Sequence, residues 1–313
     1  MKEYFFNYYP LFNCIADKCK HTCCAGWELC IDDKSLDGYK KETSFFAPVL
    51  MDGINFKKSK FKSDKNKRCA FLNDDGLCNI ILNLGESRLC QVCRDHPRFR
   101  NFFGNVIETG LGFCCEQSTR IILSFKDKIK PVIDKNEDTI TPLDFKTERI
   151  LEFRQSILDI IQDRNTPIND RIELITNKSN LAFNEQDYKK IIKTFLRLER
   201  LDKGWTARLK RLLKTPLDKN TDNVLSHYAE QFLSNCIYRH VSSAEDVIDA
   251  RARVGACIFS WWIIKSIIST ELAKTDDDFE LIVDVIRAFS SEVEYSEKNL
   301  SKLFTFTRKY VKI

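Results

Sequence analysis

The sequence carries an unusual concentration of cysteine near its N-terminus. Of the thirteen cysteines in 313 residues, eleven lie within the first 115 residues. They form one run, Cys14-x4-Cys19-x3-Cys23-Cys24-x5-Cys30, and a second series, Cys69-x8-Cys78, Cys90-x2-Cys93 and Cys114-Cys115. Thiolates are soft ligands, which select zinc, copper or iron–sulfur clusters over hard cations. The cysteine pattern therefore predicts metal binding.

The spacing alone leaves iron and zinc open. Cys90-x2-Cys93 is the one C-x-x-C pair, so a zinc ribbon with two such pairs is not matched. The bacterial ferredoxin run is also absent. Adjacent side chains such as Cys23 and Cys24 rarely reach one tetrahedral ion together. We therefore expect them to serve two sites, or one to bind metal while the other packs.

The compartment matters because disulfides are rare in a reducing cytosol. The first residues contain no long aliphatic segment with a small-residue cleavage site. The most apolar later stretch, Val254 to Ile268, is interrupted by Ser260 and Lys265 and falls short of a membrane span. We expect a cytoplasmic protein with no membrane segment, in which the thiols bind metal.

The chain divides into two unlike parts. We predict a mainly α protein, with an irregular cysteine-rich metal-binding N-terminal domain (1–126) followed by an all-α helical domain (147–313). Residues 127–146 are polar and contain Pro131 and Pro142, which is typical of a linker. We expect sulfur-bound metal, rather than a hydrophobic core of its own, to organise the first domain.

Apolar residues recur at helical spacing through the second part. Helices are expected over 150–161, from Pro167 to 175, and over 185–200, 205–214, 221–241, 244–273, 277–291 and 296–311. Cys236 and Cys257 lie in apolar helical surroundings, and we expect them to be ordinary core residues. The pair Trp261-Trp262 is likewise expected in the core.

The composition argues against a nucleic-acid binder. The net charge is +5, too weak to indicate a polyanionic partner. The basic segment 57–68 (KKSKFKSDKNKR) has few aromatic residues around it, namely Phe56 and Phe61. We interpret it as a solvated loop and expect no nucleic acid to bind.

Three cysteine-bearing stretches resemble one known family. They are FNCIADKCKHTCCAGWELCIDDKSLDGYKK (12–41), RCAFLNDDGLCNIILNLGE (68–86) and LCQVCRDHPRFRNFFGNVIETGLGFCCE (89–116). Helical segments in 154–172, 198–205 and 285–303 fit as well. The chain resembles the flagellin lysine-N-methylase family, within a wider group of cysteine-cluster proteins regarded as zinc- or iron-chelating.

The resemblance implies a cytosolic enzyme that moves a methyl group from S-adenosylmethionine to lysine amines of flagellin or another lysine-bearing protein. It also implies an iron–sulfur cluster, of the 4Fe–4S type, with zinc as the alternative metal. The cysteines it assigns to the metal are Cys14, Cys19, Cys23, Cys24, Cys69, Cys78, Cys93 and Cys114.

The sequence departs from the family at several positions. Cys30, Cys90 and Cys115 are extra cysteines. The chain has Cys114-Cys115-Glu116 where the family has Cys-Pro-Glu, and His96-Pro97-Arg98 where the family has Tyr-Pro-Arg. These differences leave room for a different substrate or metal.

Lysine methylation makes specific demands on a site. The amine must be neutral, so a base or desolvation is needed. We assign this catalytic role to Asp95, His96 and Glu116, with Asp32, Asp33 and Glu108 as further acidic candidates. An aromatic face at Trp27 can seat a sulfonium cation, and Arg94 and Arg98 can hold a carboxylate, with Arg100 as a further candidate. No GxGxxG fingerprint is present, so the cofactor is expected at the metal.

A different class of function also fits the sequence. A non-enzymatic zinc or iron–sulfur module, stabilising a helical domain that binds a protein partner, needs the same cysteines. The sequence does not predict the oligomeric state.

Overall fold

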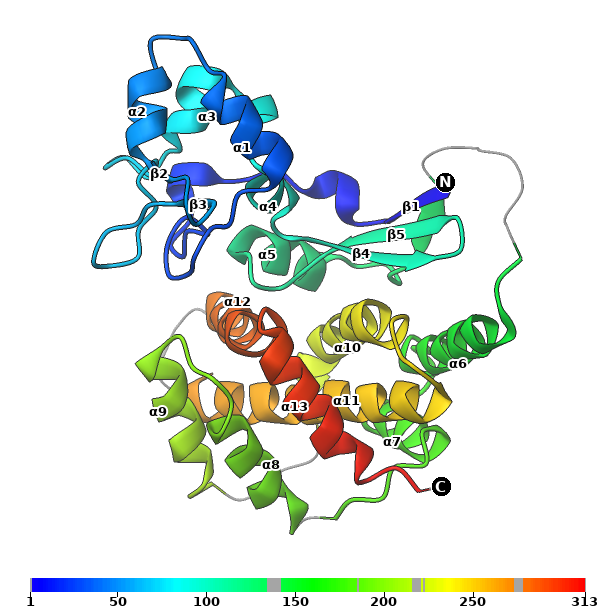
Figure 1. Cartoon of the computed structure of the whole chain (residues 1–313). Coiled ribbons are helices and arrows are strands. Elements are labelled where there is room, and N and C mark those ends of the chain that lie inside the picture. The colour runs from blue at the N-terminus through cyan, green and yellow to red at the C-terminus, as the bar shows by residue number, and fades with distance from the viewer. Residues whose placement is uncertain are drawn as a thin grey trace. The chain divides into compact units, whose positions relative to one another are not determined.

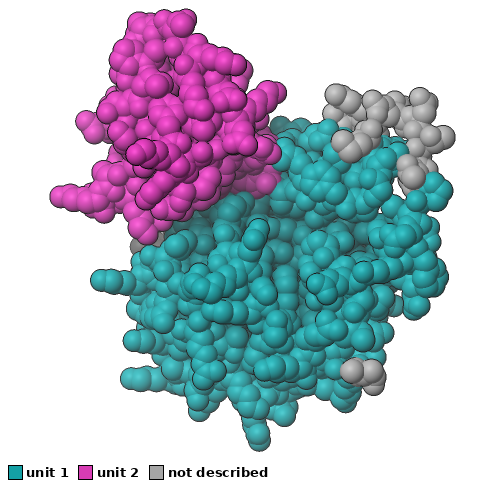
Figure 2. Space-filling model, in the orientation of Figure 1, with its two compact units in different colours: residues 1–12, 99–114, 118–313 teal, residues 13–98, 115–117 magenta. Residues whose placement is uncertain are grey.

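The computed structural model describes residues 2–133, 142–184, 186–215, 221, 223–272 and 278–312. It is mainly α, as predicted. Contacts divide the chain into two compact units, coloured separately in Figure 2. Unit 1 comprises residues 1–12, 99–114 and 118–313, and unit 2 comprises 13–98 with 115–117.

Unit 1 contains a four-stranded sheet in the order β4-β5-β1-β6. The strands are β1 (Lys2–Phe6), β4 (Arg98–Phe103), β5 (Val106–Leu111) and β6 (Pro131–Ile133). β1 runs parallel to β5, with Lys2 opposite Val106, and antiparallel to β6. This sheet was not predicted, because its central pairing joins strands about a hundred residues apart.

A glycine allows two aromatic rings to pack on this sheet. Gly110 lies against the rings of Phe6 and Phe99, and an added Cβ would lie within 2.6 Å of a Phe6 ring carbon. The absence of a side chain at this strand position thus permits the close approach. Phe6 also packs against Tyr238 of a later helix, with ring centroids 4.6 Å apart.

The helices of unit 1 follow the apolar periodicity of the sequence. After α5 (Glu116–Ser124) they are α6 (Phe145–Ile161), α7 (Ile168–Lys178), α8 (Asp187–Leu196), α9 (Lys203–Leu212), α10 (Ser226–Val241), α11 (Val247–Glu271), α12 (Asp278–Phe289) and α13 (Glu297–Arg308). A short π-helical turn, η6 (Ser290–Glu294), joins α12 to α13. Each helix predicted after residue 147 has a counterpart here.

α11 is the central helix of unit 1. It packs against α6, α7, α9, α10, α12 and α13, and Figure 1 shows it running beneath α10 and behind α13. Its composition and length suffice for a membrane span, but 89% of its most apolar window is buried inside the protein. A helix that is apolar all round is suited to such a central position.

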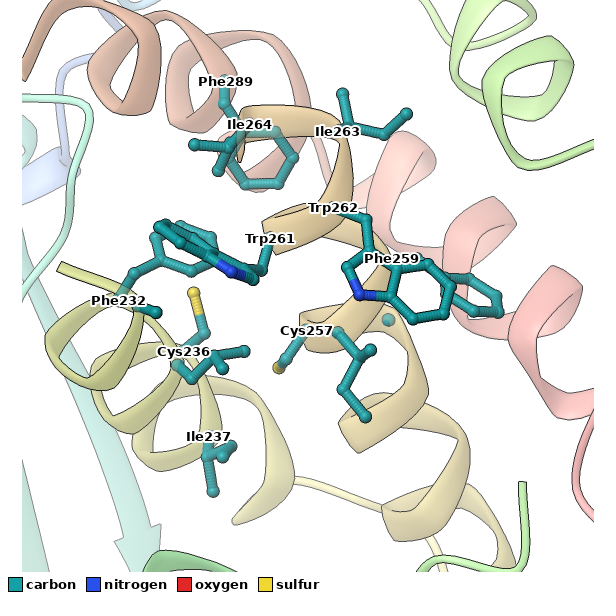
Figure 3. Close-up of a cluster of buried hydrophobic side chains, with 14 of the residues drawn as sticks. Phe232, Cys236, Ile237, Cys257, Phe259, Trp261, Trp262, Ile263, Ile264 and Phe289 are labelled. Carbon is teal, nitrogen blue, oxygen red and sulfur yellow. The ribbon is translucent and has the colours of Figure 1, made fainter. Parts of the chain in front are cut away.

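The core around α11 is rich in aromatic side chains. Figure 3 shows Trp261, Trp262 and Phe259 on α11 beside Phe232 and Cys236 of α10. Phe232 packs on Trp261, with ring centroids 5.8 Å apart. Trp261, Trp262, Cys236 and Cys257 are all buried, as predicted.

Hydrogen bonds attach α10 to the sheet. The Tyr8 hydroxyl donates to Asn235 Oδ1 at 2.6 Å and accepts from the Leu111 N–H at 3.2 Å. Asn235 Nδ2 in turn donates to the Leu111 carbonyl at 3.1 Å. Because these groups are buried, their mutual satisfaction fixes the rotation of α10.

Unit 2 is built from short elements. They are η2 (Ala16–Lys18), α1 (Asp33–Lys40), α2 (Ala47–Asp52), β2 (Ile54–Asn55), β3 (Lys60–Phe61), α3 (Asn79–Leu84), η3 (Glu86–Arg88) and α4 (Gln91–Asp95). β3 lies inside the basic segment 57–68 and pairs antiparallel with β2. Lys60 of that segment forms an ion pair with Glu28, so the basic segment is partly ordered by its own neighbours.

Unit 2 does have a hydrophobic core, contrary to our expectation. The buried cluster includes Leu36, Tyr39, Leu50, Phe71 and Ile80, together with the cysteines Cys69 and Cys90. The ring of Phe71 lies directly against Gly53, where a Cβ would overlap it. Thiols and apolar side chains therefore share one interior.

The boundaries of the predicted domains differ from those of the two compact units. The range 1–126 includes β1, β4 and β5, which belong to the sheet of unit 1. The range 127–146 includes β6, and its residues 134–141 lie outside the described residues.

Candidate metal centre

Four thiols of unit 2 form a first thiol group, which we define as Cys14, Cys19, Cys23 and Cys115. A hydrogen bond to Cys24 and burial raise the pKa of the Cys23 thiol, and the nearby Cys115 and Cys14 raise it further. Burial raises the pKa of Cys19 to about 11, and Cys115 contributes to that shift. The members thus lie close enough to influence one another's ionisation.

Glu116 holds the loop of this first group in place. Its Oε2 accepts hydrogen bonds from the backbone N–H groups of Lys20 at 3.0 Å and His21 at 3.2 Å, and the Cys19 thiol donates to it at 3.7 Å. Glu116 is buried and directly follows Cys115 in the chain. This carboxylate therefore keeps Cys115 next to the loop that carries Cys19.

Five further thiols form a second thiol group, Cys24, Cys69, Cys78, Cys90 and Cys93. The Cys69 N–H donates to the Cys24 carbonyl at 2.8 Å, and the Cys93 N–H donates to the Cys90 carbonyl at 3.1 Å. Burial raises the pKa of Cys69 to about 11, with contributions from Cys24, Cys78 and Cys90. A hydrogen bond with Cys90 raises the pKa of Cys93, and Cys24 and Cys69 raise it further.

Cys23 and Cys24 lie where the two groups meet. Their thiols hydrogen-bond each other, and this bond lowers the pKa of Cys24 to about 7. Cys23 interacts with members of the first group, whereas Cys24 interacts with members of the second. The two adjacent cysteines thus link two groups of four and five thiols.

The structure distributes the predicted ligands unevenly. Seven of the eight lie in the two thiol groups, and Cys90 and Cys115, which we had regarded as extra, lie there too. Cys114 belongs to unit 1, where it hydrogen-bonds Tyr295 and lies near Arg239. Cys30 is exposed beside Lys60. The pairs Cys90-x2-Cys93 and Cys114-Cys115 were the sequence signals that could have identified the two additional thiols.

The donor set can be tested against the two candidate metals. A tetrahedral zinc with Zn–S bonds of about 2.3 Å holds its sulfurs about 3.8 Å apart. Within the described residues, the one group of three possible ligand atoms within 4.8 Å of one another contains a single thiol, Cys236, and lies in unit 1. The all-thiol groups of unit 2 fit both metals, since four thiolates can hold zinc or an iron–sulfur cluster.

Several predicted cofactor-binding and catalytic residues lie on α4 or just after it, and Trp27 contacts both Cys23 and His96. Trp27 Nε1 donates to the Cys23 carbonyl at 2.7 Å, and its ring centroid is 6.2 Å from that of His96. Arg98 Nη1 donates to the carbonyl of Arg94 at 2.8 Å. Asp95 is the last residue of α4. Unit 2 therefore assembles an aromatic face, two arginines and an imidazole around α4.

The remaining acidic candidates are placed differently. Asp32 caps α1, where it accepts from the Ser35 N–H at 2.9 Å, and its other oxygen accepts from the Gln91 N–H at 2.8 Å. Asp33 is exposed in the first turn of α1. Glu108 belongs to unit 1 and is buried there. Arg100 is exposed on β4.

Comparisons with known proteins identify relatives of part of the chain. A lysine-N-methylase of Salmonella typhimurium is 26% identical over 157 residues, which cover 48% of this chain and 38% of that protein. The lysine-N-methylase of Salmonella choleraesuis matches to the same extent. The flagellar biosynthetic protein FliU of Salmonella muenchen is 26% identical over 124 residues, covering 37% of this chain and 73% of that protein.

The matched region spans well under half the length of the two lysine-N-methylases, 38% of each. No family model matches the chain, and no solved structure matches it. The relatives nevertheless confirm, at 26% identity, the resemblance of this chain to the flagellin lysine-N-methylase family.

Proposed function

We propose that this protein is a cytoplasmic protein-lysine N-methyltransferase that uses S-adenosylmethionine, with flagellin as its substrate. The observation that carries the proposal is the coincidence of two features. The chain is similar to proteins named lysine-N-methylase and FliU. It also gathers nine thiols into two groups beside aromatic and basic side chains in unit 2.

We propose further that the thiol groups hold iron–sulfur clusters, of the 4Fe–4S type. Cys14, Cys19, Cys23 and Cys115 would hold one, and four of the five thiols in the second group would hold another. If three of the four thiols in one group ligate its cluster, the fourth iron would have an open position that can bind the amine of an amino acid. All-thiol ligation fits a 4Fe–4S cluster, and the resemblance to the flagellin lysine-N-methylase family favours iron over zinc.

The residues of unit 2 then have distinct roles. Methyl transfer forms an N–C bond as the S–C bond of the sulfonium breaks, and the product ammonium must lose a proton. His96 or Asp95 accepts the proton that keeps the lysine amine neutral. The ring of Trp27 faces the sulfonium, and Arg94 and Arg98 hold the cofactor carboxylate. Glu116 positions the first thiol group through Lys20 and His21, so we now assign it a positioning role.

The test is methyl transfer from labelled S-adenosylmethionine to recombinant flagellin, with the chain purified anaerobically. Wild type should label flagellin lysines, and Cys23→Ala should lose the labelling together with part of its iron. Cys30→Ala is the matched control, because Cys30 is exposed beside Lys60, and it should retain both.

Two results would contradict the proposal. If iron-loaded wild type labels no lysine, the chain is a metal-binding module with a helical protein-interaction domain rather than an enzyme. If Cys23→Ala labels flagellin as fast as wild type after losing the iron of the first thiol group, that cluster has no catalytic role.

A further inference from the structure

A second set of metal-ligand side chains lies inside unit 1. α10 carries Cys236 and His240 four residues apart, on one face of the helix. Glu294 comes from the π-helical turn η6. The ligand atoms of these three buried residues lie within 4.8 Å of one another. They come from segments more than fifty residues apart, so the fold itself brings them together.

Cys257 of α11 adds a fourth donor. Its thiol hydrogen-bonds that of Cys236, and Figure 3 shows the two cysteines on adjoining helices. Both are buried. Two thiols, an imidazole and a carboxylate are all ligand types that zinc takes in proteins.

The four side chains line one cavity. It has a volume of about 10 Å³, and its lining is otherwise apolar except for Ser260. The Ser260 hydroxyl donates to the Ala256 carbonyl of its own helix at 2.7 Å. Such a volume accommodates about one water-sized sphere, which suits a single ion and excludes an organic ligand.

One carboxylate oxygen of Glu294 faces the other proposed ligands, and the second oxygen is held by hydrogen bonds. Its Oε1 lies 3.7 Å from the Cys236 sulfur and 2.7 Å from His240 Nε2. Its Oε2 is held on the other side by the Ser290 hydroxyl at 2.5 Å and by Arg239 at 3.4 Å. Partners of this kind orient the ligands of metal sites, and π-helical turns are common at functional sites.

The charges of the set balance around a divalent ion. Glu294 forms buried ion pairs with Arg239 at 3.4 Å and, when the imidazole is protonated, with His240 at 2.7 Å. Two thiolates and this carboxylate carry three negative charges, which a divalent cation and Arg239 neutralise. Arg239 is fixed over the ring of Tyr295, 4.8 Å from its centroid. A buried site needs such compensation.

We propose that Cys236, His240, Cys257 and Glu294 form a closed four-ligand site for one zinc ion. The ion joins α10, α11 and η6, with Arg239 and Ser290 supporting Glu294. On binding, both thiols release their protons to solvent, and His240 binds through Nε2 with its remaining proton on Nδ1. With four protein ligands, the site is structural. It is separate from the thiol groups of unit 2 and does not depend on the proposed function.

Metal analysis of the full-length chain tests the site. Wild type expressed with added zinc should contain one more equivalent of zinc than the Cys236→Ala/Cys257→Ala double variant or His240→Gln. Iron content should be the same in all of them. Ser260 lines the same cavity but is not a proposed zinc ligand. The control variant Ser260→Ala should therefore keep its zinc. Equal zinc in wild type and in folded His240→Gln would overturn the proposal.

A measurement on unaltered protein covers the case in which the variants do not fold. X-ray absorption at the zinc edge of wild type should show sulfur together with nitrogen or oxygen ligands, including imidazole. A shell of four sulfurs, a wild type without zinc, or recovery of Cys236 and Cys257 as a disulfide by peptide mapping each rejects the site.

Discussion

Arg154 and Glu108 form a bidentate ion pair in the interior of unit 1. The two Nη atoms of Arg154 donate to opposite oxygens of Glu108, at 2.6 and 2.8 Å. Both side chains are less than a tenth exposed. Arg154 also lies over the ring of Tyr238, 5.0 Å from its centroid. Glu108, one of our acidic candidates, is thus committed to joining the sheet to α6.

Glu108→Ala should therefore destabilise the protein strongly. It leaves the buried guanidinium of Arg154 without its carboxylate, a change that costs about 3–5 kcal/mol in comparable pairs. Urea unfolding followed by circular dichroism measures the loss. Glu152→Ala, on an exposed position of α6, should change the free energy of unfolding by less than about 0.5 kcal/mol. Similar effects of the two variants would mean that the pair contributes little.

The two thiol groups should load metal separately. Cys14→Ala changes the first group and Cys69→Ala changes the second. We expect each to lower the iron and sulfide content in part, and the double variant to lower it further, because Cys14 and Cys69 lie in different groups, which the adjacent Cys23 and Cys24 link. Iron and sulfide analysis after anaerobic purification measures this, with Cys30→Ala as control. Complete loss of iron from either single variant would show that all nine thiols serve one centre.

Asp32 should matter for stability rather than as a base. One oxygen caps α1 at Ser35 and the other accepts from the Gln91 N–H beside Cys90. Asp32→Ala should cost about 2 kcal/mol, the sum of a lost helix cap and an unsatisfied backbone donor. Asp33→Ala, at the neighbouring exposed position, should be nearly neutral in the same chemical unfolding experiment. If Asp32→Ala instead abolishes methyl transfer and leaves stability intact, the residue is catalytic.

The stability of unit 1 should fall in acid partly because of Asp284. Burial raises the pKa of Asp284, but ion pairs with Arg208 at 2.8 Å and Arg287 at 3.1 Å outweigh it, so the pKa lies below its ordinary value of 3.8. The stabilisation is therefore complete well above pH 3.8 and is lost as the pH falls toward the lower folded-state pKa. Asp284→Asn should cost about 1–3 kcal/mol at pH 7, and less at pH 3.

Thermal or chemical unfolding across this pH range measures the Asp284 contribution. The matched control is Asp159→Asn, at an exposed position of α6. If the free energies of unfolding of wild type and Asp284→Asn differ by the same amount from pH 7 to pH 3, ionised Asp284 is not the source of the difference.

Local signals accounted for the helices but not for the sheet. The 3.6-residue periodicity in the second half of the chain depends on neighbours a few positions apart, so α6 to α13 could be predicted. β1 and β5 are short, and Lys2 pairs with Val106 across a sequence separation that contains residues 13–98 of unit 2. The residues within and beside each strand contain no pattern that predicts this pairing.

The candidate sites show the same division between local and long-range information. Cysteine spacing identified the region of the thiol groups, but the roles of Cys90 and Cys115 depend on how α4 and Glu116 are placed. Cys236 and Cys257 were predicted correctly as buried. Their proximity to His240 and Glu294 could not be predicted from the sequence, because it depends on helix packing and on the turn at η6.

The order in which the strands occur along the chain has a consequence for biosynthesis. β1 leaves the ribosome well before its parallel partner β5, which begins at Val106, after the whole of residues 13–98. The thiol-rich segment is therefore translated while β1 is not yet paired with β5. Under the proposed function, iron and sulfide would reach the thiols in that interval, before the pairing of β1 with β5 fixes both ends of the inserted segment.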